Sequence, residues 1–461
     1  MINAGGTFRY RAGDFPESRV VLLWQDCPGR DDLETEEDGP IKVLYPGRIN
    51  DDSGADYRDA VVATSRGLLT GDIEIHTRSS QWWEHRHHLD PIYNRVVLHV
   101  VFRRDIAKAV RLENGREIPT LALESLFRQN SEPSLLAIPP VPCSGIAVMR
   151  NADFLAGILD MAGEQRFLSR AAGYQTVSSQ EETGQSLYRG IMAALGYAKN
   201  EHAMAELACR MPLRRLERLV TANAPATECL ARYQAMLMGS AGFLPSQVAV
   251  WREKNSAWID RLEKLWTASG DAITMSLRDW HFFRVRPGNA PARRIAAMSR
   301  LLLRYRHEGL LDGLIGRFDN LATGDNCRAL EAAFCIGGGD DGSGLAESGQ
   351  CGRNSETLLG RDRAADIVVN VFLPFAVAWG RANTHPELVE KAIEIYRRYP
   401  ALATNTLVRH MSRQLGITGS TVNTARRQQG LLHIFKTLCS RGGCQNCPVN
   451  RAVKRSPGDA W

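Results

Sequence analysis

The sequence lacks a long uninterrupted apolar run. Its most apolar stretch, residues 367–380, contains Asn370 and Pro374. A membrane-spanning helix needs about 20 predominantly apolar residues, so we expect this shorter stretch to be a buried helix and expect no membrane partner. The N-terminal residues also lack the apolar segment and cleavage site of a secretory signal. We therefore expect a cytoplasmic protein.

Charge and cysteine are limited as well. A net charge of +6 over 461 residues permits a polyanionic partner such as nucleic acid without requiring one. Ten cysteines are too few for a disulfide scaffold, and in a protein that is not exported they should stay reduced and available for metal. The length exceeds that of one ordinary core, so we expect two or three substructures.

A phosphate-binding loop is also missing. Residues 337–360 are rich in glycine, serine and aspartate, but no Gly-Lys-Ser/Thr motif follows the glycines. That motif is what places a lysine and a hydroxyl on bound phosphates. We expect a flexible loop here instead.

Residues 1–135 are predicted to form a small α/β domain with a mixed sheet. Short β-rich runs alternate with turn residues, which is typical of strands. The six predicted strands are 41–44, 59–64, 71–76, 95–102, 107–112 and 118–123. Asn114-Gly115, between the last two, indicates a hairpin. Helices are predicted at 16–25 and 80–88, and the acidic run 31–38 is predicted to be a solvated loop.

Beyond the proline-rich joint at residues 138–142 the pattern changes. Apolar residues now recur at intervals of three and four, which indicates helices. We expect a helical body over residues 150–438 and a separate C-terminal cysteine segment over residues 439–461. The predicted fold class is therefore α+β.

Two carboxylates and a histidine are the first candidate site. Glu74 and His76 alternate with Ile73 and Ile75, so in a strand they would share one face while the isoleucines enter the core. If the preceding strand is a neighbour, Asp56 would lie beside Glu74. Carboxylate oxygens suit Mg²⁺, which could position a water for attack on phosphate. The alternative is that Asp56 caps a turn and Glu74 is an exposed strand residue.

Histidines are concentrated in the same region. Five of the eleven fall within 24 positions: His76, His85, His87, His88 and His99. On a helix, His85 and His88 would share a face and His87 would not. A zinc site of His76, His85 and His99 is one possibility, since three neutral imidazoles suit catalytic zinc. The other is that these residues hydrogen-bond to one another.

The order of these features resembles the PD-(D/E)XK nuclease superfamily. That resemblance implies a restriction-endonuclease-like sheet, with Asp56 and Glu74 holding the metal and Glu17 contributing from the first helix. The superfamily's lysine position is occupied by His76. Transition-state stabilisation would then fall to His76 or to Arg78, which we also assign to nucleic-acid binding.

A second resemblance covers nearly the whole chain. It is to the uncharacterised bacterial domain-of-unknown-function 2851 family, which implies the domain layout rather than a chemistry. The motifs that carry it are Gly54-Ala55-Asp56-Tyr57, Gly71-Asp72-Ile73-Glu74-Ile75-His76, Ser79-Ser80-Gln81-Trp82, His85-Arg86-His87, Asp90, Tyr93, Val97-Leu98-His99-Val100-Val101, Met238 to Leu244, Arg286 to Pro291, Asn370 to Phe375 and the terminal cysteines.

The C-terminal cysteines are the second candidate site. Cys439, Cys444 and Cys447 give a C-x4-C-x2-C spacing, whose second half is the tight turn that brings two thiolates to one ion. Zn²⁺ or a [4Fe–4S] cluster needs a fourth ligand. Cys143, at the joint between the predicted domains, is the preferred fourth ligand. Weaker candidates are Cys327, Cys335 and His433.

Two segments could contact nucleic acid. Between Phe282 and His307 there are seven arginines and no acidic residue. From this region we assign Arg284, Arg286, Arg293 and Arg294 to phosphate contacts, since arginine offers forked donors. Residues 409–428 have the spacing of a helix-turn-helix, although two packed helices joined at Gly416 would give the same pattern.

The sequence thus predicts a metal-dependent nuclease in which Asp56, Glu74, His76 and Glu17 are catalytic. The alternatives are a non-catalytic DNA-binding protein with a helix-turn-helix-like segment and structural zinc, or a histidine–zinc hydrolase acting on another substrate.

Overall fold

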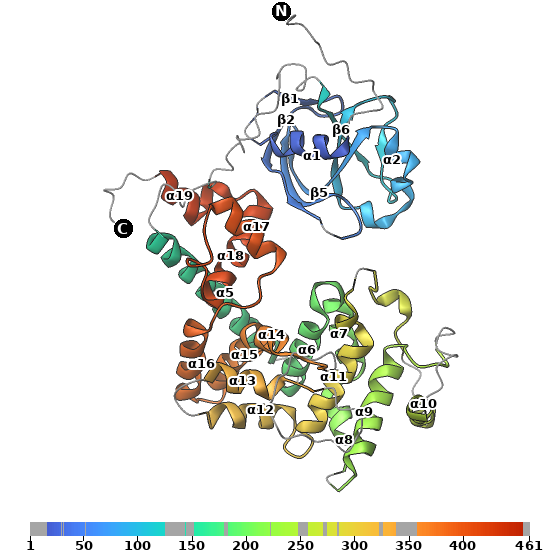
Figure 1. Ribbon diagram of the computed structural model, residues 1–461, viewed down its shortest axis with the longest axis vertical. Helices are drawn as coiled ribbons and strands as arrows, with labels where there is room; N and C mark the ends of the chain where they lie inside the picture. The colour runs from blue at the N-terminus through green and yellow to red at the C-terminus, as the bar shows by residue number, and fades with distance from the viewer. Residues whose placement is uncertain are drawn as a thin grey trace, which may run out of the picture. The chain divides into compact units, whose positions relative to one another are not determined.

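A computed structural model describes the chain at residues 16–28, 30, 32–50, 52–124, 143, 152–178, 183–221, 223–247, 257–270, 274–283, 285–321, 326–337 and 357–454. Residues 138–142, Arg284 and most of the glycine-rich segment lie outside the described residues. The chain divides into two compact units (Figure 1). Unit 1 comprises Met1–Ala162, Asn405–Val422 and Gly430–Trp461, and unit 2 comprises Gly163–Thr404 and Asn423–Gln429.

The sheet of unit 1 closes into a barrel-like ring. Its strands are β1 (Leu33–Thr35), β2 (Gly39–Tyr45), β3 (Arg48–Ile49), β4 (Tyr57–Thr64), β5 (Gly67–Arg78), β6 (Val96–Arg103) and β9 (Thr120–Ala122). They are ordered β2-β1-β9-β6-β5-β4-β3, and β2 also pairs with β4, which closes a ring of six strands. The pairings of β6 with β5 and β9 are parallel and the others are antiparallel, so the sheet is mixed as predicted.

Most of the predicted elements are present. Helix α1 (Glu17–Gln25) begins after Pro16, and β7 (Val110–Arg111) and β8 (Glu117–Ile118) form the predicted hairpin around Asn114-Gly115. Val20 and Trp24 of α1 are fully buried in one core with residues of the sheet, because these two side chains lie on the same face of the helix.

Two local predictions were wrong. The acidic run contains strand β1, in which Leu33 and Thr35 are buried while Glu34 between them is exposed. The alternation that stabilises this strand is too short to stand out among its charged neighbours. The predicted helix 80–88 is also interrupted: α2 (Gln81–Glu84) ends early, and the 3₁₀ helix η1 (His87–Leu89) follows a turn.

The centre of β5 is shaped by its neighbours on both sides. The pairing with β4 shifts register between Tyr57 and Ala60, and the pairing with β6 shifts between Asp72 and Ile73. Gly71 permits the close approach of β6, since a Cβ there would lie 2.4 Å from the Arg95 carbonyl oxygen. Such irregularities re-aim the side chains that follow them. Glu74 comes directly after this point.

The C-terminal helices pack on the sheet of unit 1 rather than forming part of the helical body. Tyr45 of β2 and Val61 of β4 share a core with residues of α5 (Ala152–Ser178), α17 (Thr406–Leu415) and α18 (Ala425–Thr437). The tyrosine ring contacts Phe435 edge-on, and its hydroxyl is hydrogen-bonded to His410. Residues 150–162, 405–422 and 430–438 of the predicted helical body thus fall in unit 1, because their apolar side chains share a core with Tyr45 and Val61 of the sheet.

The segment predicted as a helix-turn-helix has a connection between its two helices that is too long for that motif. Helix α17 ends at Leu415 with Gly416 in the left-handed conformation, and α18 begins only at Ala425. The residues between the helices outnumber the three or four of a helix-turn-helix turn. Val408, Met411 and Val422 from this segment are buried in the core that includes Tyr45, which indicates a packing role.

Unit 2 is helical and is built around a single large core. Its helices are the C-terminal part of α5, then α6 (Thr183–Leu195), α7 (Tyr197–Arg210), α8 (Leu213–Arg218), α9 (Ala226–Ser240), α10 (Ala257–Ser269), α11 (Pro291–Arg304), α12 (Leu310–Asp319), α13 (Asn326–Phe334), α14 (Arg361–Ile367), α15 (Leu373–Ala382) and α16 (Pro386–Arg398). The structure therefore combines a β-rich unit with a helical one, as an α+β class predicts.

The most apolar stretch forms a core helix of unit 2. Residues Arg361–Ala382 are continuously helical and long enough to cross a membrane by length and composition, so the predicted length was too short. However, 78% of its apolar window is buried, which is typical of a core helix. Pro374 has no N–H to offer the Asn370 carbonyl, and Arg170 donates to that oxygen instead at 2.6 Å. A π-helical turn, η6 (Val368–Phe372), accommodates this change.

The contact between His410 and the sheet predicts a dependence of stability on pH. Burial lowers the pKa of His410 to about 4, and Arg48 and Arg413 lower it further, while the Gln414 side chain opposes the shift. A depressed histidine pKa contributes stability that is present above the unfolded value of 6.5 and is lost as pH falls toward 4. Between pH 7 and 4.5, the free energy of unfolding of the wild type should fall by about 2 kcal/mol more than that of His410→Gln. Urea unfolding at both pH values measures this, and equal losses in both proteins would contradict it.

Candidate metal-binding active site

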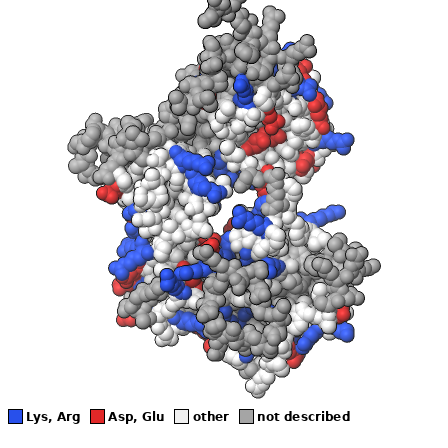
Figure 2. Space-filling model, in the orientation of Figure 1, with Lys and Arg blue, Asp and Glu red and all other residues white. Residues whose placement is uncertain are grey.

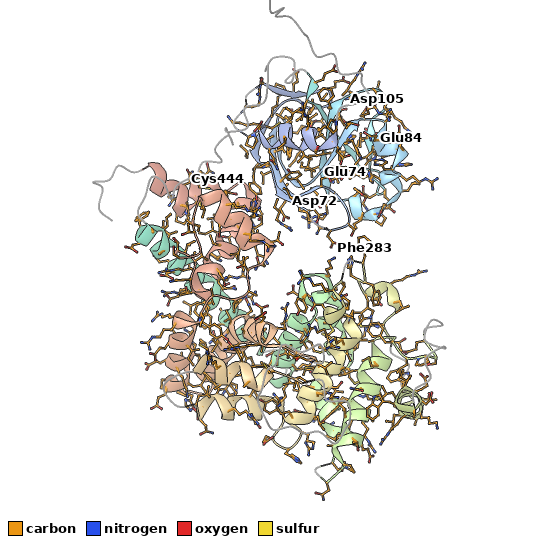
Figure 3. All side chains as sticks on the ribbon, viewed as in Figure 1. Asp72, Glu74, Glu84, Asp105, Phe283 and Cys444 are labelled. Carbon is orange, nitrogen blue, oxygen red and sulfur yellow. The ribbon has the colours of Figure 1, made fainter. Side chains whose placement is uncertain are left out.

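The candidate site lies on one face of the parallel pair β5 and β6. Glu74 of β5 is the register partner of His99 of β6. Ile73 and Ile75 enter the core that contains α1, while Glu74 and His76 lie on the other face, as their alternation predicted. Glu74, His76 and His99 are all buried, with exposed fractions of 6%, 2% and 0%. Figure 3 shows Glu74 within the sheet domain.

Asp56 lies directly beside Glu74. The backbone N–H of Asp56 donates to Oε2 of Glu74 at 3.2 Å, and the N–H of Ile75 donates to Oδ2 of Asp56 at 2.9 Å. The loop before Asp56 is fixed by Asn50, whose side-chain amide donates to the Ala55 carbonyl at 2.8 Å. Each carboxylate thus contacts the backbone next to the other, and the predicted proximity of Asp56 and Glu74 is present.

The two carboxylates share an environment that disfavours two negative charges. Burial, with a further contribution from Glu74, raises the pKa of Asp56 to about 7. Burial raises the pKa of Glu74 to about 8, and the charge of Glu17 raises it further. Glu17, at the exposed start of α1, thus acts electrostatically on both carboxylates. A cation would relieve the repulsion among these groups.

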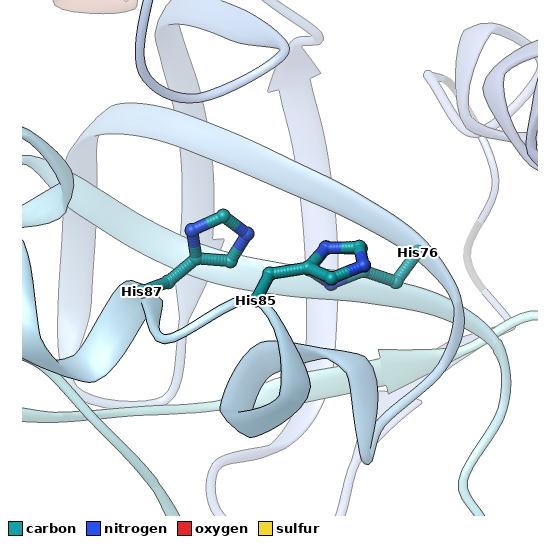
Figure 4. Close-up of side chains that lie close together, drawn as sticks. All are labelled: His76, His85 and His87. Carbon is teal, nitrogen blue, oxygen red and sulfur yellow. The ribbon is translucent and has the colours of Figure 1, made fainter.

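Three histidine rings lie close together, and two of them face Glu74. His76, His85 and His87 offer ligand atoms that all lie within 4.8 Å of one another (Figure 4). Nε2 of His87 lies 3.2 Å from Oε1 of Glu74, and Nε2 of His76 lies 3.5 Å from the same oxygen. Nδ1 of His85 lies 3.2 Å from Nε2 of His76. The three histidines thus bring their ligand atoms close together, and two of them, His76 and His87, also lie beside the Glu74 carboxylate.

A turn at Arg86 selects which histidines take part. Arg86 has φ +61°, in the left-handed region, and stands between the end of α2 and the start of η1. Because the helix is broken there, His85 and His87 converge, whereas the ring of His88 packs at a tilt against Trp83. The predicted pairing of His85 with His88 is therefore wrong. An arginine with a left-handed backbone conformation is rare, and the spacing of the histidines in the sequence could not predict it.

His99 supports the trio rather than joining it. Its Nε2 lies 2.9 Å from Nδ1 of His76, so it contacts the nitrogen of His76 that faces away from Glu74. The sequence offered His76, His85 and His99 as one possible set of zinc ligands, whereas the three histidines whose ligand atoms lie close together are His76, His85 and His87. Contacts of this kind fix the tautomer and orientation of a ligating histidine.

The histidines are held in the form that binds metals. Burial, with His99 and the other histidines, lowers the pKa of His76 to about 2, and burial lowers that of His99 to about 3. Burial also lowers the pKa of His87. These imidazoles are therefore neutral near pH 7, as metal ligands must be. Nε2 of His87 is buried, and although it lies 3.2 Å from Oε1 of Glu74, it forms no hydrogen bond with that oxygen or with any other group in the described part of the chain.

The set of donors favours a transition metal. Imidazoles suit Zn²⁺ and other late metals, whereas carboxylates and water suit Mg²⁺ and Mn²⁺. Glu74 with His76, His85 and His87 fits Zn²⁺ or Mn²⁺ better than the Mg²⁺ predicted from Asp56 and Glu74 alone. Solvent can reach the site from the side of His85 and Glu17, because these two residues are exposed whereas Glu74 and His87 are buried.

Tyr93 is a further residue at the site that the sequence did not single out. Its ring centroid lies 4.0 Å from that of His87, and burial with the charges of Glu74 and Asp90 raises the pKa of its hydroxyl. The phenol stays protonated near pH 7 and can donate a hydrogen bond.

The predicted arginines have mixed placements. Arg78, at the end of β5, lies within 3.4 Å of Glu84 and 3.6 Å of Asp105. Arg294 is only 6% exposed and donates to the Leu358 carbonyl, so its prediction as a phosphate contact is wrong: its donors are used inside the fold. Arg293 donates to the Thr357 carbonyl.

The remaining arginines add little. Arg286 lies at the start of the 3₁₀ helix η5 (Pro287–Asn289), and Arg284 lies outside the described residues. Arg304, from the same basic region, donates to the carbonyls of Ala333 and Cys335. Arg293, Arg294 and Arg304 thus all donate to backbone carbonyl oxygens inside the fold.

The arrangement predicts that His87 binds a cation and that His88 does not. Mn²⁺ is the suitable probe, because soft thiolates elsewhere in the chain bind it poorly. His85→Ala and His87→Ala should each weaken Mn²⁺ binding by at least about 10-fold in titration calorimetry, since each removes a nitrogen ligand. His88→Ala is the matched control and should bind Mn²⁺ as the wild type does. Equal affinities in all three variants would contradict the assignment.

Comparison with known proteins places the chain in a family. The model of a family described as a protein of unknown function (DUF2851) matches residues 17–404, which include the whole candidate site but not the three C-terminal cysteines. No curated protein and no solved structure matches the chain, and nothing in these comparisons supports the resemblance to the PD-(D/E)XK superfamily. The resemblance predicted from the sequence motifs is confirmed by the family match, and the chain belongs to the DUF2851 family.

Proposed function

We propose that this protein is a metal-dependent hydrolase that cleaves phosphodiester bonds in nucleic acid. One observation carries the proposal: the buried carboxylate of Glu74 faces two neutral histidines through Oε1 and the Asp56 backbone through Oε2. A carboxylate without a cationic partner is costly to bury, and neutral histidines do not supply the missing charge. A divalent cation at this point compensates Glu74 and uses the free nitrogen of His87.

The residues divide between binding and proton transfer. Glu74, His76, His85 and His87 would hold the cation, which supplies Lewis acidity to a phosphate and its attacking water when bound. Asp56 has one oxygen held by the Ile75 amide, which orients the other oxygen to receive a proton from water. Glu17 lies at the exposed entrance and is suited to pass that proton to solvent. Tyr93, which packs on His87 and keeps its hydroxyl proton, would donate a hydrogen bond to the substrate.

The order of elements supports the phosphodiester class. An initial helix carrying Glu17 is followed by Asp56 at the start of β4, Glu74-x-His76 on β5, a short helix and the parallel strand β6. This is the order that the resemblance to PD-(D/E)XK nucleases implies, although here the strands close into a ring. His76 occupies the lysine position, so its neutral ring serves as a ligand rather than a cation.

Binding of a substrate phosphate requires a positively charged side chain that is not already paired with a carboxylate of the protein. Figure 2 shows Lys and Arg scattered over the visible surface and not gathered in one patch. Arg86 meets the requirement best: it is exposed, it lies between His85 and His87, and it has no ion pair within the described ranges. Its guanidinium can therefore bind a phosphate beside the metal.

Loss of one carboxylate tests the activity itself. The purified full chain, given Mn²⁺, Zn²⁺ or Mg²⁺ separately, should cleave single- or double-stranded DNA or RNA oligonucleotides in a metal-dependent manner. Glu74→Gln should lower the rate by about 100-fold or more, because the neutral amide cannot compensate a divalent cation. Glu84→Gln, which alters an exposed carboxylate on α2, should leave the rate unchanged.

A different result separates the alternatives. Binding of DNA in a gel shift, without cleavage under any of the three cations, would identify a non-catalytic DNA-binding protein. Cleavage of a small phosphodiester but of no oligonucleotide would preserve the metal chemistry and remove the nucleic-acid substrate.

The role of Arg86 has its own test. Arg86→Ala should raise KM for an oligonucleotide by about 10-fold with a smaller effect on kcat, as expected for loss of one charge-assisted hydrogen bond to the substrate. The control is Arg66→Ala, which removes an exposed arginine on the β4–β5 turn that is paired with Asp38. An unchanged KM for Arg86→Ala would exclude this residue from phosphate binding.

A further inference from the structure

A second cluster of potential ligands lies in unit 1, well away in sequence from the histidines. Cys439 begins the 3₁₀ helix η7 (Cys439–Arg441), and Cys444 begins η8 (Cys444–Asn446). Cys447 directly precedes α19 (Pro448–Lys454), beside which Figure 3 labels Cys444. Cys143 comes from the joint that precedes α5.

These cysteines are brought together by one apolar core. Cys143, Cys439 and Cys447 are 6%, 5% and 5% exposed, and they belong to the core that also contains Tyr45 and Val61 of the sheet. Cys444 is half-buried. The cluster therefore joins a residue near the start of α5 to the C-terminal segment and places both against the sheet.

The backbone around the cysteines is shaped to bring them close. Gly442 has φ +66°, which lets the chain reverse between Cys439 and Cys444. A Cβ at this glycine would lie 3.0 Å from Val61 of β4, so the turn rests directly on the sheet. The N–H of Cys447 donates to the Cys444 carbonyl at 3.1 Å, which forms the tight turn between the last two cysteines.

The four thiols act on one another electrostatically. Burial raises the pKa of Cys143 to about 11, and the charges of Cys447 and Cys444 raise it further. Burial also raises the pKa of Cys439, as do the charges of the three other cysteines. Four thiolates could share this space only if a cation offset their repulsion.

Several donors point at the sulfurs. Nε2 of Gln414 lies 3.2 Å from Sγ of Cys143, and the backbone N–H groups of Val449 and Asn450 act on Cys447 to lower its pKa. Donors of this kind stabilise thiolate and not thiol. Hydrogen bonds to ligand sulfurs are a regular feature of iron–sulfur and zinc sites.

The simpler alternative is that four buried cysteines pack as small apolar residues. Cys27 does so in the same unit: it is fully buried, and its thiol donates to the Leu23 carbonyl. The quartet differs from Cys27 in three respects: three of its members share one core, a donor is directed at a sulfur, and the C-x4-C-x2-C segment forms a tight turn. Apolar packing explains neither the donor nor the turn.

The separation of the sulfurs distinguishes between the two common four-cysteine centres. Around Zn²⁺, Zn–S bonds of about 2.3 Å in a tetrahedron place the sulfurs roughly 3.8 Å apart. Among the described residues, His76, His85 and His87 form a group whose ligand atoms all lie within 4.8 Å of one another. No three of the four cysteine sulfurs form such a group, so these sulfurs lie further apart than ligands of one zinc ion. In a [4Fe–4S] cluster each cysteine binds a different iron, so the sulfurs stand further apart.

We propose that Cys143, Cys439, Cys444 and Cys447 together bind a [4Fe–4S] cluster that fastens the C-terminal segment and the start of α5 to the sheet. Cys143 and Cys439 are 296 positions apart (439 − 143), so the cluster closes a very long loop. Restricting such a loop lowers the entropy of the unfolded chain. The role is structural, and it does not depend on the hydrolase proposed for the histidine site.

Metal analysis of the full chain tests the cluster directly. The protein is purified without oxygen after expression with added iron, and its iron, acid-labile sulfide, zinc and visible absorption are measured. We expect about four iron and four sulfide per chain and a brown colour from broad absorption near 400 nm. One zinc per chain without iron, or absence of any bound metal, would overturn the proposal.

Variants separate ligation from packing. Cys143→Ser and Cys447→Ser should each abolish the visible absorption and lower the melting temperature of the purified chain. Cys27→Ser is the control, because it removes an equally buried thiol of unit 1 and should retain full iron and sulfide. If a ligand variant does not fold, the iron content of the wild type still decides the proposal. If Cys143→Ser keeps all four irons, Cys143 is not a ligand and the proposed set is wrong.

Discussion

The structure of unit 1 depends on one electrostatic constraint, the burial of the Glu74 carboxylate. Removing a carboxylate from water costs several kcal/mol unless a cation or a full set of donors replaces the solvent. Glu74 receives one backbone N–H from Asp56 and faces histidines that burial keeps neutral. The irregular pairing around Gly71 and the left-handed turn at Arg86 both serve to bring groups to this carboxylate. Without a cation the site holds a proton; with one, the neutral histidines become ligands.

The parts of the site that depend on local periodicity could be predicted from the sequence. Strict alternation along β5 placed Glu74 and His76 on one face and the isoleucines on the other, because a strand has a fixed period of two. The proximity of Asp56 followed from antiparallel pairing of neighbouring strands. The hairpin at Asn114-Gly115 was predictable for the same reason, since its turn chemistry is local. The family resemblance rested on motifs in these segments and in the helical region, and the family match confirms it over residues 17–404.

The parts of the structure that depend on nonlocal pairing or on rare backbone conformations could not be predicted from the sequence. Closure of the ring requires β2 to pair with β4. The sequence of neither strand indicates that the other strand is its partner. His87 enters the site only because Arg86 adopts a left-handed conformation, which spacing does not reveal. Helix α17 belongs with the sheet because His410 and Met411 meet residues of unit 1, although its own apolar pattern is that of any surface helix. In each case the information lies in a partner distant in the chain.

The two ligand clusters of unit 1 differ in a way that assigns them different roles. The histidine site has one exposed member, His85, and an exposed acidic neighbour, Glu17, so a substrate can reach it. Three of the four cysteines are almost completely buried in an apolar core, where no substrate could approach a bound ion. Hydrolysis requires an open ligand position, whereas a structural centre requires closure. This difference in access is what we expect if the histidines serve the proposed hydrolase and the cysteines the proposed structural cluster. The cluster would then hold in place the C-terminal segment and the start of α5, whose residues share a core with the sheet from which the histidine site is built.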